Sequence, residues 1–190
     1  MEITLEAVTA AIDQHNAQGQ HPREVFDLLR FLADNPHTNS PPKLIIEVGV
    51  WLGGNAAVYK TFFPDVRIIG VDVVNRTEFD GVEMVVGNSG DGGTRARVEE
   101  LLDGQKADFL FIDADHVYAS VKRDYEMWRS LAQLVGFHDV HNPSVLRFWQ
   151  ETTALQLIES DGVGPTFALW KEWNGHGIGV ILQDTDPGSH

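Results

Sequence analysis

The chain has 190 residues, a formal net charge of −14 and no cysteine. It therefore suits one domain, or a domain with a small cap, without disulfides, thiolate metal sites or cysteine nucleophiles, and its acidity argues against a nucleic-acid partner. No apolar stretch of about 18 residues is present, and the acidic N-terminus lacks the pattern of a signal peptide, so we expect no membrane partner and a cytoplasmic location.

Two helices are expected first, over residues 3–17 and 22–34. The second begins at Pro22, and its apolar side chains recur at helical spacing, at Val25, Leu28, Leu29 and Leu32. We assign residues 1–42 to an N-terminal helical cap.

From residue 43 onward, short apolar runs alternate with helical stretches. Strands are expected at 43–48, 67–72, 82–86, 108–113, 134–140, 154–159 and 178–183, and helices at 53–62, 93–103, 116–131 and 144–151. Short buried strands that alternate with helices are typical of an α/β fold with a doubly wound, mostly parallel sheet, here of seven strands. Residues 43–190 therefore form the expected α/β domain.

The connection near residues 131–136 is unusually short. The predicted helix ends near Leu131 and the next strand follows almost at once, whereas about 2–6 residues usually intervene. Either the fifth strand starts later than residue 134 or a short loop is missing from the numbered sequence, and the residues alone leave both readings open.

The first strand runs into a glycine-rich turn, Glu47-Val48-Gly49-Val50-Trp51-Leu52-Gly53. Glycines at such a turn allow sharp bends and a close approach of the backbone to a ligand. The second strand ends in Asp72, whose carboxylate can accept hydrogen bonds from two ribose hydroxyls. The third is followed by Asn88 and Ser89, which can read the edge of an adenine. All of these residues follow the carboxyl ends of strands, where ligands bind in open α/β sheets.

The spacing Glu47-x-Gly49-x-x-x-Gly53 resembles the first motif of class I S-adenosylmethionine-dependent methyltransferases more than the Gly-x-Gly-x-x-Gly turn of dinucleotide enzymes. The resemblance implies a Rossmann-like methyltransferase fold, with the turn against the methionine part of the cofactor and Asp72 on the ribose. Trp51 either walls the cofactor pocket or fills the core. The expected cofactor-binding residues are Glu47, Gly49, Trp51, Gly53, Asp72, Asn88, Ser89 and Asp113.

A second group of polar residues follows the fourth and fifth predicted strands. The fourth leads into Asp113, Asp115 and His116, and the fifth into His138 and Asp139. If these strands are neighbours, Asp113 and Asp139 meet at one rim of the sheet. Two carboxylates with an imidazole nearby can bind a divalent cation such as Mg²⁺, which can polarise an acceptor hydroxyl.

This group resembles the metal-dependent O-methyltransferases, which include catechol, caffeoyl-coenzyme A and sugar enzymes and cephalosporin-hydroxylase-like proteins. The resemblance covers roughly residues 43–142. It implies metal ligands at Asp113, His138 and Asp139, and a general base at His116, so that His116 and Asp113 are the expected catalytic residues. His138 departs from the usual Asp or Glu, and an imidazole either favours softer ions such as Mn²⁺, Fe²⁺ or Zn²⁺ over Mg²⁺ or indicates that no metal binds.

Several residues keep a second interpretation. Asp115 also fits an N-cap of the following helix, and His141 and Asn142 fit either spare ligands or loop residues. His176 has no companion at site spacing and is expected to be solvated. The segment 170–177 fits either a substrate-facing loop or a contact in a homodimer.

The expected function is therefore methyl transfer from S-adenosylmethionine to a hydroxyl of a small molecule, assisted by Mg²⁺ or Mn²⁺. The alternatives are a non-catalytic S-adenosylmethionine-binding module on the same fold and, with less support from the glycine spacing, an NAD-dependent oxidoreductase. Asp113, His116 and Asp139 discriminate between them, because a mere binder needs no acids and base beside its ligand. The identity of the acceptor stays open.

Overall fold

Two helices precede the sheet. Helix α1 (Leu5–Gln14) begins after Thr4, whose side-chain oxygen accepts a hydrogen bond from the Ala7 N–H. Helix α2 (Pro22–Ala33) begins at a proline, which suits a first turn whose N–H groups have no intrahelical partner. The computed structural model describes residues 1–17, 19–34, 40–159, 167–170 and 175–182.

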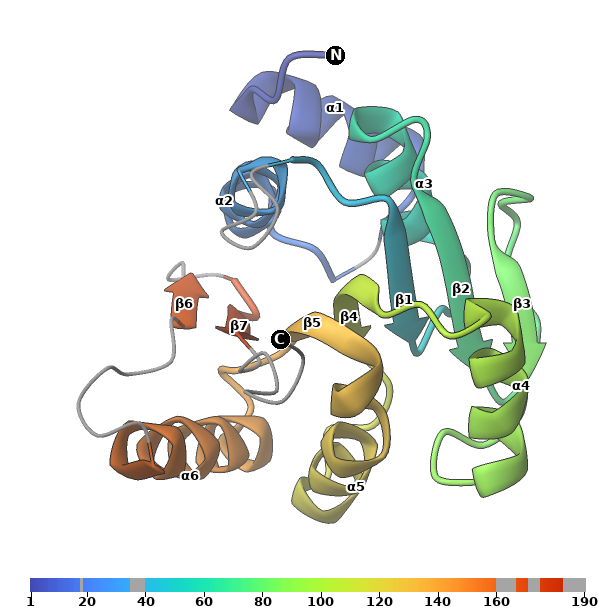
Figure 1. Ribbon diagram of the computed structural model, residues 1–190. Coiled ribbons are helices and arrows are strands. Elements are labelled where there is room, and N and C mark those ends of the chain that lie inside the picture. The colour runs from blue at the N-terminus through green and yellow to red at the C-terminus, as the bar shows by residue number, and fades with distance from the viewer. Residues whose placement is uncertain (18, 35–39, 160–166, 171–174, 183–190) are drawn as a thin grey trace.

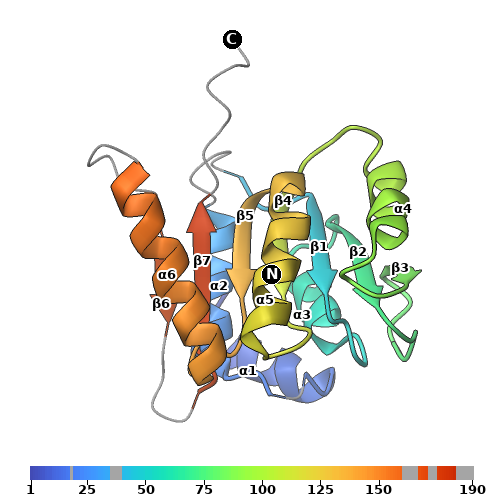
Figure 2. The same cartoon turned by 90° about the horizontal axis from the view of Figure 1, so that it is seen from below.

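Seven strands form one sheet in the order β3-β2-β1-β4-β5-β7-β6. Strands β1 to β5 pair in parallel with their neighbours, whereas β7 runs antiparallel to both β5 and β6, as the opposed arrows of β5 and β7 show in Figure 2. The predicted α/β class with a mostly parallel seven-stranded sheet is confirmed. The bounds are β1 Leu44–Val48, β2 Arg67–Asp72, β3 Glu83–Val86, β4 Ala107–Ile112, β5 Ala132–Phe137, β6 Phe167–Trp170 and β7 Ile178–Leu182.

Helices cover both faces of the sheet. Helix α3 (Gly54–Phe62) lies with α1 and α2 on one face, and α4 (Gly92–Leu102), α5 (Tyr118–Trp128) and α6 (Pro143–Glu159) lie on the other (Figure 1). Successive strand residues point to opposite faces. Accordingly Ile46 and Leu110 belong to the core under α4–α6, whereas Ile45 and Phe109 belong to the core under α1–α3. The sheet is thus buried on both sides.

The ends of the central strands stand side by side. The Gly49 N–H donates to the Val71 oxygen and the Asp113 N–H donates to the Val48 oxygen, both at 2.8 Å, and the His138 N–H donates to the Ile112 oxygen at 3.1 Å. The chain leaves β1 toward one face of the sheet and β4 toward the other. Such a switch point opens a crevice at the carboxyl ends of the strands, where ligands of open α/β sheets bind.

Two expectations about the last third of the chain are wrong. Residues 154–159, predicted as a strand, belong to α6, and the sixth strand is Phe167–Trp170. A short apolar run cannot be told from a helix by periodicity alone, and no glycine or proline separates this run from the preceding helix. The fifth strand, expected at 134–140, runs over Ala132–Phe137 and follows a 3₁₀ turn at Arg129–Leu131 directly, so the reading with a later start is excluded.

Within the described part of the chain, no helix has the length and apolar character needed to cross a membrane. Residues 18 and 35–39 of the predicted cap, 171–174 of the predicted loop at 170–177 and residue 183 of the last predicted strand lie outside the described residues.

Candidate active site

The turn after β1 brings the glycine-rich segment against the end of β4. Gly49 has a φ of +93°, and a Cβ at this position would lie 2.3 Å from the backbone oxygen of Asp113. Gly53, with a φ of +84°, precedes α3, and a Cβ there would lie 2.2 Å from Thr77 Oγ1. Both positions need glycine, because they combine positive φ with a close neighbour.

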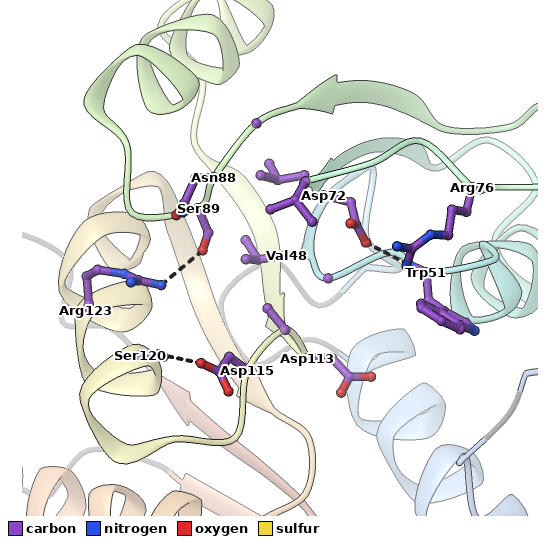
Figure 3. Close-up of a pocket in the computed structure, with 15 residues that line it drawn as sticks. Val48, Trp51, Asp72, Arg76, Asn88, Ser89, Asp113, Asp115, Ser120 and Arg123 are labelled. Atoms are coloured by element: carbon purple, nitrogen blue, oxygen red, sulfur yellow. Dashed lines mark hydrogen bonds between the residues drawn. The ribbon is translucent and has the colours of Figure 1, made fainter.

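Asp72, at the end of β2, holds the same turn. Its Oδ2 accepts hydrogen bonds from the Val50 and Trp51 N–H groups at 3.1 and 3.0 Å, and its Oδ1 accepts one from the Val74 N–H at 3.2 Å. Figure 3 shows the carboxylate pointing at the turn. The side chain predicted to hold a ribose therefore also fixes the glycine-rich turn, and its oxygens keep further lone pairs for ligand hydroxyls.

A pocket of about 420 Å³ opens at these strand ends (Figure 3). Its volume lies in the range of small-molecule sites. Asn88 and Ser89 form part of its wall. The Ser89 hydroxyl donates a hydrogen bond to the buried carboxylate of Asp124 at 2.8 Å, which fixes the Ser89 side chain in the wall. Six of the predicted cofactor-binding residues line the pocket, namely Gly49, Trp51, Asp72, Asn88, Ser89 and Asp113, whereas Glu47 and Gly53 do not.

Trp51 lies at the mouth of this pocket. Its φ of +52° is uncommon for a residue other than glycine, and its side chain is 55% exposed. The guanidinium of Arg76 lies 4.7 Å from the centre of the ring. A side chain so exposed does not fill the core, so the reading of Trp51 as a pocket wall is the one that its position supports.

Glu47 lies within the sheet. It is fully buried, and no described residue makes a well-formed hydrogen bond to its carboxylate oxygens, although the side-chain amide of Asn55 lies near enough to favour the charged form. Burial, and then the charge of Asp113, raise the pKa of Glu47 to about 8, so that its neutral form prevails at neutral pH. The prediction that Glu47 binds the cofactor gains no support from this position.

Replacing Glu47 with glutamine is expected to make stability less dependent on pH. The pKa of about 8 in the folded state lies above the ordinary value of 4.5, so the wild type loses stability as the pH rises between these values, by at most about 1.4 kcal/mol per pH unit. Glutamine has no proton to lose. In urea unfolding between about pH 5 and about pH 8, the free energy of unfolding of the variant should increase relative to that of the wild type as the pH rises. If the difference in free energy of unfolding between the variant and the wild type does not change with pH, Glu47 is not protonated in the folded protein.

The second group of predicted residues gathers at the ends of β4 and β5. His138 Nδ1 lies 3.1 Å from Asp113 Oδ1 and 3.0 Å from Asp139 Oδ2, and His116 Nε2 lies 2.7 Å from Asp139 Oδ2. The ligand atoms of Asp113, His116 and Asp139 lie within 4.8 Å of one another, close enough to share one ion. Asp113 and Asp139 therefore meet at one rim of the sheet, as expected for neighbouring strands.

The side chains of this cluster are charged when no ion is bound. The carboxylates of Asp113, at 3.8 Å, and Asp139, at 2.7 Å, favour the charged imidazole and raise the pKa of His116 to about 10. Burial lowers the pKa of His138, but the nearby carboxylates outweigh it and bring that pKa also to about 10. Burial raises the pKa of Asp113 and Asp139, yet the imidazoles hold both values below the usual range. His116 must therefore lose a proton before it can coordinate an ion.

The three donors that are placed to share an ion differ from the predicted set. His116, expected as a general base, joins Asp113 and Asp139. His138, expected as a ligand, is only 4% exposed, and its Nδ1 is engaged by both carboxylates. Its Nε2 has no hydrogen-bond partner among the described residues.

The remaining polar residues of this region hold loops. The His141 Nδ1–H donates to the Gly175 carbonyl oxygen at 2.6 Å, and Asn142 Oδ1 accepts from the Ser144 N–H at 3.0 Å. Asp115 accepts from the Val117 N–H at 3.2 Å in the turn before α5, whose N-cap position is Val117 itself. Asp115 is thus near the helix start but is not its N-cap.

His176, which the sequence indicates as solvated, also belongs to the cluster. Its Nδ1 lies 2.6 Å from Asp139 Oδ1, and its ring stacks on that of His138 with the centroids 5.5 Å apart. The antiparallel pairing of β7 with β5 brings the residues just before β7 beside those just after β5. A Gly-His-Gly sequence before the last strand was the available signal, and it has meaning only once the strand order is known.

A second pocket, of about 360 Å³, opens on this cluster. Its wall includes the acids and histidines of the cluster, part of the glycine-rich turn, and Asn16, Ala17 and Gly19 from the segment between α1 and α2. Gly49, Trp51 and Asp113 line both pockets. Two ligands, one in each pocket, would therefore approach each other at these three residues.

Comparison with known proteins gives a family and a fold. The family model described as a methyltransferase domain matches residues 46–142, about half of the chain. No curated protein sequence matches the chain.

Solved structures of similar fold include the MycE methyltransferase from the mycinamycin biosynthetic pathway, in complex with Mg and SAH, at a TM-score of 0.69 and 13% identity over 96% of this chain. This chain spans only 56% of the length of that protein. A Staphylococcus aureus protein assigned as a caffeoyl-CoA O-methyltransferase matches at a TM-score of 0.62 and 15% identity, over 95% of this chain and 92% of that one. A Klebsiella pneumoniae protein assigned as an O-methyltransferase matches at a TM-score of 0.58 and 15% identity, over 95% of this chain and 90% of that one. At such identities the likeness is one of fold.

Proposed function

The chain belongs to the methyltransferase-domain family, and from this premise we propose that it transfers a methyl group from S-adenosylmethionine to a hydroxyl oxygen of a small molecule. The observation that carries the proposal is the meeting of two pockets at Gly49, Trp51 and Asp113, one at the glycine-rich turn and one at the acid–histidine cluster. Holding two reactants at attack distance can lower a barrier by several kcal/mol without any further chemistry.

We assign the first pocket to the cofactor. Asp72 is placed to accept ribose hydroxyls while it fixes the glycine-rich turn, and Gly49 lets the backbone approach the methionine part. Asn88 and Ser89 lie on the wall where an adenine edge would be read. Asp113, at the junction of the two pockets, offers a negative charge to the positive sulfonium.

The cluster in the second pocket has a donor set that fits a divalent ion. Two carboxylates and an imidazole with ligand atoms within 4.8 Å suit Mn²⁺ and, less closely, Mg²⁺. We assign Asp113, His116 and Asp139 as the ligands, with His138 as the alternative nitrogen donor. When bound, such an ion polarises a hydroxyl and lowers its pKa.

We assign the second pocket to the methyl acceptor. Its wall combines apolar groups, such as Leu52, with the amides of Asn16 and Asn55, which suits a molecule that is apolar in part and carries hydroxyls. A structurally similar methyltransferase is described in complex with Mg, SAH and mycinamycin VI, which supports a small-molecule acceptor. With His116 on the ion, we assign the proton of the acceptor to His138, whose Nε2 no described residue engages and which lines this pocket; it takes the proton when its imidazole is neutral.

The two predicted parts of the chain divide this work. Residues 1–42 contribute Asn16, Ala17 and Gly19 to the acceptor pocket, whereas the cofactor pocket is built from residues 48–123. We therefore propose that the helical cap selects the acceptor and that the α/β domain at 43–190 binds the cofactor.

Replacing Asp139 with asparagine is expected to separate the ion from the cofactor. Asp139 lines only the second of the two pockets, and its φ of +56° is one that asparagine also adopts. Losing one of two ligand charges should weaken Mn²⁺ binding by at least about 100-fold, or ~2.7 kcal/mol, and leave S-adenosylmethionine affinity within about threefold. Calorimetric titration with each ligand measures both.

The matched control for the ion is Asp115→Asn, a change of an exposed carboxylate in the β4–α5 connection that lines only the first pocket and is not one of the three ion donors. It should leave Mn²⁺ affinity unchanged. Equal Mn²⁺ binding by Asp139→Asn and the wild type, or no Mn²⁺ binding by the wild type, would contradict the proposed ion site.

A further inference from the structure

The ring of His176 stacks on that of His138, and its Nδ1 contacts Asp139. A carboxylate oxygen accepts, so the His176 Nδ1–H donates to Asp139 Oδ1, at 2.6 Å. The opposite oxygen, Oδ2, faces His116 Nε2 at 2.7 Å and His138 Nδ1 at 3.0 Å. The two oxygens of Asp139 thus have different partners, and His176 holds the one that points away from the proposed ion ligands.

The backbone around His176 is fixed by the residues that follow Asp139. The His141 N–H donates to the His176 oxygen at 2.9 Å, and the Val140 N–H donates to the Gly177 oxygen at 3.2 Å. The His141 side chain adds its own bond to the Gly175 oxygen at 2.6 Å. Three hydrogen bonds therefore hold the Gly175–Gly177 segment beside the cluster.

A fourth hydrogen bond joins this segment to the N-terminal cap. Glu24 of α2 is fully buried, and both of its carboxylate oxygens lie 3.1 Å from the Gly177 N–H. A Cβ at Gly175 would lie 2.1 Å from Glu24 Oε1, and one at Gly177, whose φ is +79°, would lie 2.5 Å from Val140 Cγ2. The two glycines thus allow the segment to pass between the cap and the loop after β5.

We propose that His176 is a positioning residue of the ion site and that Glu24 positions His176 in turn. The terminal torsion of an aspartate is soft and nearly two-fold, so a lone carboxylate can present either oxygen. With Oδ1 held by His176, Asp139 presents Oδ2 to the proposed ion, and the hydrogen bond that orients the ligand carboxylate comes from the far end of the chain. The inference rests on the proposed function, because it takes the cluster as a divalent-ion site.

The first test compares His176→Ala with His176→Asn, whose side-chain amide can donate from nearly the position of Nδ1. Loss of a hydrogen bond that orients a ligand typically weakens metal binding by about 10–100-fold. His176→Ala should show a loss in that range for Mn²⁺ in calorimetry and an altered electron paramagnetic resonance spectrum of the bound ion. His176→Asn should recover most of the affinity. The matched control is His15→Ala, since His15 Nε2 bonds to Thr61 Oγ1 and lines neither of the two site pockets.

The second test addresses the tie to Glu24. Gly175→Ala would push a methyl group against the Glu24 carboxylate and should weaken Mn²⁺ binding without touching any ion ligand. Gly92→Ala is the matched glycine change, because nothing lies within 4 Å of a Cβ at that position. It should bind Mn²⁺ as the wild type does. S-adenosylmethionine affinity, measured on every variant, reports whether the α/β domain is intact.

The outcomes separate this inference from the proposed function. If the wild type binds Mn²⁺ and His176→Ala binds it equally well, the positioning role of His176 is overturned and the ion site still stands. A loss that His176→Asn does not recover would also overturn it, since the donor would then not be the cause. Absence of Mn²⁺ binding by the wild type would overturn both the ion site and the inference, while S-adenosylmethionine binding would still stand.

Discussion

Replacing Asp72 with alanine is expected to weaken S-adenosylmethionine binding by at least about 100-fold. In the proposed function, Asp72 accepts hydrogen bonds from the two ribose hydroxyls of the cofactor. Hydrogen bonds to a charged group contribute about 1.5–3 kcal/mol each to binding. The substitution also removes the acceptor of the Val50 and Trp51 N–H groups, so the glycine-rich turn loses its tie to β2. Both effects act on the first pocket, and isothermal titration calorimetry measures their sum.

Two companion variants make this result interpretable. Asp72→Asn keeps one acceptor oxygen and should fall between alanine and the wild type. Asp80→Ala removes an exposed carboxylate from the same β2–β3 connection, outside both pockets, and should bind the cofactor normally. If Asp72→Ala binds S-adenosylmethionine as tightly as Asp80→Ala does, Asp72 is not a cofactor residue.

Replacing Gly49 with alanine should have the largest effect on the fold. The added Cβ would lie 2.3 Å from the Asp113 oxygen and 2.6 Å from its carbonyl carbon. Because these are backbone atoms between two paired strands, the ends of β1 and β4 would have to separate. Overpacking costs about 1–3 kcal/mol and the positive φ of alanine about 1–2 kcal/mol more, so we expect a loss of about 3 kcal/mol and of cofactor binding with it.

Gly104→Ala isolates the contribution of φ. Gly104 has a φ of +78°, but nothing lies within 4 Å of a Cβ at this position. Urea unfolding should therefore show about 1–2 kcal/mol of destabilisation for Gly104→Ala and a clearly larger value for Gly49→Ala. Equal losses in the two variants would mean that the contact between the turn and Asp113 is not tight.

Features that depend on neighbouring residues were predictable from the sequence. The glycine-rich turn, Asp72 and the polar ends of β4 and β5 each lie within a few residues of an apolar strand, and the rule that ligands bind at carboxyl ends of parallel strands groups them. The expected resemblance to methyltransferases is confirmed by the family model over residues 46–142. The same reasoning placed Asp113 and Asp139 at one rim, where the structure has them.

Features that depend on distant pairings were not predictable. His176 reaches Asp139 only because β7 inserts antiparallel between β5 and β6, and no local pattern specifies that order. The bond from Gly177 to Glu24 joins positions 153 residues apart. Which histidine has a ligand atom close to both Asp113 and Asp139 depends on side-chain directions after two different strands, and the structure groups His116 with the two carboxylates. Burial of Glu47 follows from the width of the sheet, which a single strand does not reveal.

The central claim is that the first pocket binds S-adenosylmethionine, and a calorimetric titration of the wild-type protein tests it most directly, with NAD titrated in parallel. The account predicts one site per chain with a dissociation constant on the order of micromolar and no heat from NAD. Absence of S-adenosylmethionine binding, or binding of NAD in its place, would contradict the account.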